Sequence, residues 1–101
     1  MWTEMQIRNA IQTNDMDVCK AVVTIYRKQT KSEQVDRSTH NTNGVGFNKI
    51  DAKFLTSIAE QIIRNKRMGR DNLLSPAQIK AARKVIVKYS KQLAKIANGK
   101  I

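Results

Sequence analysis

Residues 75–99 read "SPAQIKAARKVIVKYSKQLAKIANG", and helix signals bound this stretch at both ends. Ser75 is a preferred N-cap residue, Pro76 suits the first helical position, and Gly99 is typical of the residue that follows a helix. Between them, apolar residues recur every three or four positions and predict one continuous seam: Ile79, Ala82, Ile86, Tyr89, Leu93 and Ile96. We therefore expect a long final helix that packs through this seam.

The opposite face of this helix is basic. Five lysines recur at helical spacing, and we call them the lysine stripe: Lys80, Lys84, Lys88, Lys91 and Lys95. At about 100° per residue they fall almost opposite the apolar seam. Lysine often serves only to solvate a helix face, but such faces usually mix signs because a Glu four residues before a Lys adds stability. No Asp or Glu follows Asp71, so a surface for a polyanion is the better interpretation.

Charge is distributed just as unevenly over the whole chain. The net charge is +11, and residues 49–101 hold thirteen basic and three acidic residues, against six and five in residues 1–48. Such an excess indicates nucleic acid as the first candidate partner, and an anionic membrane or an acidic protein as the second. We expect further basic residues to extend the stripe into one patch: Arg64, Lys66, Arg67, Arg70 and Arg83. Lysine suits contact with the phosphate backbone, and arginine can add bidentate contacts.

The rest of the chain is also expected to be helical. Thr3 with Gln6 forms the pattern of a capping box, and Asn14 or Asp15 is expected to cap a second helix. Asn48 is expected to cap a third helix whose buried face holds Phe54, Leu55, Ile58, Ile62 and Ile63, and Gly69 to end it. A flexible polar loop is predicted over about residues 31–47. The chain is thus predicted to be a single all-α domain over residues 1–101, a compact bundle of about four helices.

Residues that could perform chemistry are scarce. His40 is the only histidine and Cys19 the only cysteine, so neither a zinc site nor a Cys-His or Ser-His-Asp arrangement is expected. The stretch "NGVGFN" at 43–48 lacks the third glycine and the lysine of phosphate-binding loops. Phe47 is the one candidate for base stacking there, and a core position suits it better. We predict no catalytic residue, no metal and no cofactor. A single cysteine and the absence of a signal peptide or an 18-residue apolar run favour the cytoplasm.

Several segments of the chain share a pattern: G-x-G-F-N followed by D-A-x-F, then L-S-x-x-Q, then A-R-K and K-Y-x-x-Q-L. The residues that carry it are Gly44, Gly46, Phe47, Asn48, Asp51, Ala52, Phe54, Leu74, Ser75, Gln78, Ala82, Arg83, Lys84, Lys88, Tyr89, Gln92 and Leu93. In this pattern the chain resembles a family of small, mostly uncharacterised proteins of bacteriophages and mobile elements, a module similar to accessory segments beside helicase domains. The resemblance implies a nucleic-acid role with these contact residues: Arg83, Lys84, Lys88 and Gln92.

These observations predict a non-catalytic accessory protein that binds DNA or RNA through its basic final helix. The alternative, which the phage resemblance implies, is an anti-defence inhibitor, as anti-CRISPR proteins are. Such an inhibitor would dock on an acidic surface or in the nucleic-acid channel of a host protein. A membrane partner is disfavoured because the apolar seam is needed for the core. Reversing the charge of Lys84, Lys88 and Lys91 is expected to remove polyanion binding and to leave the fold intact.

Overall fold

A computed structural model describes residues 1–36 and 46–99. Within these ranges the chain forms helices and no strands, which confirms the predicted all-α class. The helices are α1 (Glu4–Thr13), α2 (Asp15–Asp36), α3 (Ala52–Arg67), α4 (Pro76–Ile86) and α5 (Ser90–Ala97). A 3-10 turn, η1 (Val87–Tyr89), joins α4 to α5, so the C-terminal helix runs over 22 residues and the bundle has four helical units, as predicted.

Capping residues set most helix ends where the sequence predicts them. Thr3 and Gln6 form a capping box at the start of α1, and Ser75 and Gln78 form a second one at the start of α4. In each box the side chain of one residue bonds the backbone N–H of the other, which satisfies two donors that the first turn leaves unpaired. Gly69 ends α3 with a φ of 73°, a conformation that costs little only for glycine.

Three local predictions differ from the structure. α3 is bounded at Ala52 and not directly after Asn48. The predicted capping bond of Asn48 is nevertheless present, because its side-chain oxygen accepts from the Asp51 N–H at 2.9 Å and its carbonyl accepts from the Ala52 N–H at 2.9 Å. Phe54 was expected to be buried but is 38% exposed. α2 continues to Asp36, so the predicted loop begins later than residue 31. The remainder of that loop, residues 37–45 with His40 and Gly44, lies outside the described residues.

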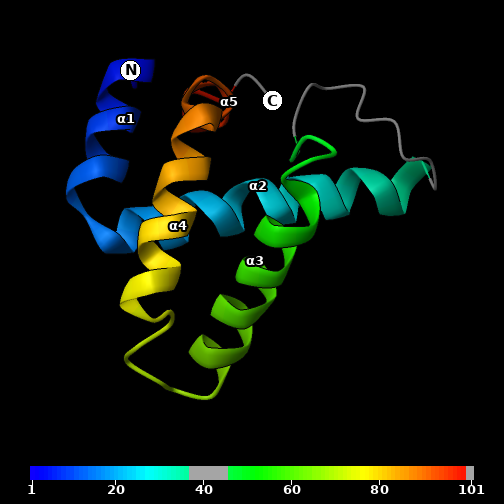
Figure 1. Cartoon of the computed structure of the whole chain (residues 1–101). Helices are drawn as coiled ribbons and strands as arrows, with labels where there is room; N and C mark the ends of the chain where they lie inside the picture. The colour runs from blue at the N-terminus through cyan, green and yellow to red at the C-terminus, as the bar shows by residue number, and fades with distance from the viewer. Residues whose placement is uncertain (37–45, 100–101) are drawn as a thin grey trace.

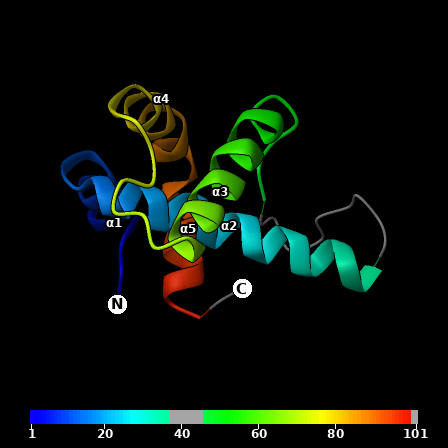
Figure 2. The same cartoon turned by 90° about the horizontal axis from the view of Figure 1, so that it is seen from below.

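α2 is the element on which the other helices pack. Figure 1 shows α1 beside α4 and α5 near one end of α2, with α3 crossing α2 farther along. In the view from below, α3 and α4 lie on the same side of α2 (Figure 2). The core forms where these helices meet, and its fully buried side chains include Ile11, Val18, Val22, Ile25, Leu55 and Ile86. The radius of gyration of 13.2 Å is the value expected for a folded domain of about 100 residues.

Candidate nucleic-acid interface

The final helix has the two faces that its spacing predicts. Ala82, Ile86, Tyr89 and Leu93 of the apolar seam are buried against the other helices, and Ile79 and Ile96 are partly buried. All five lysines of the stripe are exposed. Four of them have no carboxylate partner in the described part of the chain: Lys80, Lys84, Lys91 and Lys95. With a rise of about 1.5 Å per residue, the stripe spans about 22 Å along the helix.

Lys88 differs from the other lysines of the stripe because it pairs with a buried carboxylate. Its Nζ lies 3.0 Å from Oδ2 of Asp51, a side chain that is only 10% exposed. The Tyr89 hydroxyl donates to the same oxygen at 2.9 Å and accepts from the backbone N–H of Asn48 at 2.9 Å. Lys88 therefore holds the start of α3 against the final helix, although its own side chain remains 56% exposed.

These contacts shift the titration of the groups involved. The hydrogen bond from Lys88 is the main cause that lowers the pKa of Asp51; bonds from Tyr89 and Asn48 add to it and outweigh the effect of burial. Burial raises the pKa of Tyr89 to about 12, and the neighbouring Asp51 carboxylate adds to the rise. At neutral pH the carboxylate is thus charged and the phenol protonated, which is the arrangement in which the phenol can donate.

Acid should therefore destabilise the protein through Asp51. A carboxyl with a lowered folded-state pKa adds stability above its unfolded value of about 4 and loses it as the pH falls through the folded value. We expect the urea midpoint of the parent to drop more steeply between about pH 4 and pH 2 than that of Asp51→Asn, which lacks this titration. If the urea midpoints of the parent and of Asp51→Asn fell equally with pH over this range, the lowered pKa would not belong to Asp51.

Other residues of the pattern that runs from G-x-G-F-N to K-Y-x-x-Q-L also attach the segment before α3 to the final helix. The Gln92 side chain accepts a bond from the Gly46 N–H at 3.0 Å, and the Phe47 ring meets the Tyr89 ring edge-on at a centroid distance of 5.9 Å. Phe47 is thus partly buried and packs against the core. Residues 46–51 are fastened to the final helix by these contacts. Lys88 and Gln92, which the resemblance implies as nucleic-acid contacts, serve this attachment.

Arg83 also has partners within the chain. Its Nε donates to the carbonyl of Ile11 at 2.9 Å, and its guanidinium pairs with the Asp15 carboxylate. The side chain is 29% exposed and ties α4 to the junction of α1 and α2. Because these contacts already occupy its guanidinium, the contact set proposed below is built on the unpaired lysines and does not include Arg83. Lys88 is left out for the same reason, so the expectation that reversing Lys88 would leave the fold intact is withdrawn.

The remaining basic residues of the predicted patch are exposed, and they lie on α3 and in the turn that follows it rather than on the final helix. Lys66 and Arg67 line a groove between α3 and α2, together with Lys20 and Arg27. Arg64 lies with Glu60 along another side of α3. Arg70 lies in the turn that leads to α4. Lys20 and Arg27 were not among the predicted contacts, although their spacing of seven residues places them on one face of α2.

The described residues include no group of three or more His, Cys, Asp or Glu that could hold a metal ion. Cys19 is buried, and burial raises the pKa of its thiol. None of the described helices combines the length and the apolar character needed to cross a membrane. Comparison with protein-family models, curated proteins and solved structures finds no match for this chain.

Proposed function

We propose that this protein binds nucleic acid without catalysis, through contacts of its lysine stripe with the phosphate backbone. The observation that carries the proposal is the exposed row of Lys80, Lys84, Lys91 and Lys95, which no carboxylate of the described residues neutralises. A row of like charges costs stability on an isolated helix. A polyanion removes that cost, because each phosphate it brings neutralises one ammonium group and releases a counterion.

The spacing of the stripe suits a phosphate backbone. Lysines four residues apart are separated by about 6 Å along the helix axis, and one DNA strand advances about 3.4 Å per phosphate. Successive lysines can therefore reach different phosphates of one strand. Arg70 is exposed between α3 and α4 and adds to the positive potential of this half of the chain. Contacts of this kind position the protein without reading bases, so we expect weak sequence preference.

Fluorescence anisotropy with labelled single-stranded DNA, duplex DNA and RNA of equal length tests this function. We expect sub-micromolar binding to at least one form at about 50 mM salt and a steep loss of affinity at about 200 mM. The expected salt slope is that of about four phosphate contacts, one for each unpaired lysine of the stripe.

Absence of binding to all three forms at low salt would contradict the proposal. That result would favour the alternative function, in which the basic surface of an inhibitor docks on an acidic surface of a host protein. Under either function we propose a phage-encoded protein that acts in the host cytoplasm, in line with the resemblance described above.

A further inference from the structure

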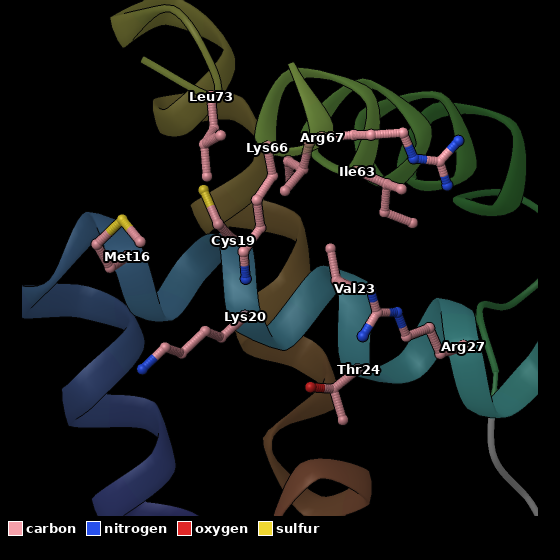
Figure 3. A pocket seen from close by; sticks show the side chains of 11 residues that line it. Met16, Cys19, Lys20, Val23, Thr24, Arg27, Ile63, Lys66, Arg67 and Leu73 are labelled. Carbon is pink, nitrogen blue, oxygen red and sulfur yellow. The ribbon is translucent and has the colours of Figure 1, made fainter. Parts of the chain in front are cut away.

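The groove between α2 and α3 combines an apolar floor with a rim of one charge sign. It has a volume of about 440 Å³, and its apolar lining includes Met16, Val23, Ile63 and Leu73. Four basic residues and no acidic residue line it: Lys20, Arg27, Lys66 and Arg67. Figure 3 shows Lys66 extending from α3 toward α2. Met16 is 52% exposed, so its apolar side chain is accessible to a ligand in the groove that it lines.

We propose that this groove binds an acidic segment of a partner protein, whose apolar side chains fill the floor while its carboxylates meet the basic rim. The volume lies in the range of pockets that enclose a few side chains. Methionine adapts its shape to varied apolar partners, as surfaces that accept peptides often require. An amphipathic helix with acidic flanks is the occupant that matches both the floor and the rim. This proposal goes beyond nucleic-acid binding and does not depend on it.

Nucleic acid is a poorer occupant of the same groove. Bases that leave a stack are held on aromatic side chains, and none of the residues that line this groove is aromatic. A duplex would touch the rim but leave the apolar floor uncovered. The lysine stripe, by contrast, presents charge without an apolar floor. The two basic surfaces thus differ in chemistry, and each suits a different partner.

A designed peptide of about 15 residues tests the groove, with leucines on one helical face and glutamates flanking them. Its control has the same composition, with the leucines spread around the helix. We expect the designed peptide to bind at micromolar Kd and to shift amide resonances of residues 16–27 and 62–73. The Arg27→Glu, Lys66→Glu variant should bind it at least about tenfold more weakly, because both substituted side chains are exposed rim charges.

The matched variant Lys84→Glu, Lys91→Glu has the same net charge but leaves the groove intact, so it should bind the peptide as the parent does. Equal binding of the control peptide would show that charge alone is recognised and would overturn the proposal. An equal loss of peptide affinity in the two variants would do the same. Nucleic-acid binding of the Arg27, Lys66 variant is measured in parallel. If that variant still binds nucleic acid while the peptide test gives one of the contradicting results, the proposal for the groove is overturned and the proposed nucleic-acid function is not.

Discussion

Replacing Tyr89 by Phe is expected to lower the free energy of unfolding by about 3 kcal/mol, a large part of the stability of a small domain. The ring and its contact with Phe47 remain, so only the hydroxyl is lost. That hydroxyl serves both Asp51 and the Asn48 N–H. Its removal takes one donor from a buried carboxylate and leaves a backbone donor without its partner. Urea unfolding followed by circular dichroism at pH 7 measures the change.

A double-mutant cycle separates the hydrogen bond from the general effect of each substitution. Asp51→Asn keeps a side-chain oxygen at the same place but removes its charge. The two substitutions together should cost less than the sum of the single ones, with a coupling of about 1–2 kcal/mol, because they affect one network. A Tyr89→Phe variant within about 0.5 kcal/mol of the parent would show that the network contributes little to the fold.

The final helix could be predicted closely because its signals are local. Ser75, Pro76 and Gln78 determine where it begins, and the three-or-four spacing of apolar residues determines which face is buried. The same spacing places the lysine stripe on the exposed face. The 3-10 turn at Val87–Tyr89 was not predicted. On both sides of this turn the apolar seam still faces the core and the lysine stripe is still exposed.

Long-range pairing could not be predicted, because nothing local distinguishes Lys88 from Lys84. Lys88 differs only in that Asp51, 37 positions earlier, is brought beside it by the packing of α3. Arg83 likewise meets Asp15 only after α4 has packed on α2. The division of the basic residues between the stripe and the α2–α3 groove has the same origin. It depends on the angle at which α3 crosses α2, which spacing along one chain does not specify.

Reversing Lys84, Lys91 and Lys95 to Glu is expected to weaken nucleic-acid binding by about 100-fold or more. On an ideal helix these three side chains point within about 40° of one another, so together they form the centre of the stripe. Each lost phosphate contact should also lower the salt slope by about one. All three are exposed and lie off the apolar seam, so the variant should keep the helical circular dichroism and Tm of the parent. Lys88 is left unchanged because of its pairing with Asp51.

A matched control separates the stripe from net charge alone. Lys28→Glu, Lys53→Glu, Lys66→Glu has the same net charge as the stripe variant and changes three exposed lysines of α2 and α3. Long-range attraction falls equally in both variants, so only local contact can make their affinities differ. We expect the control to lose no more than about tenfold in affinity.

The ratio of the two Kd values, measured by anisotropy on the nucleic acid that the parent binds most tightly, is the most direct test of the lysine stripe. We predict that the stripe variant binds at least about tenfold more weakly than the control. Equal Kd values in two folded variants would contradict the assignment, because they would show that the total charge, and not this face of the final helix, attracts the polyanion.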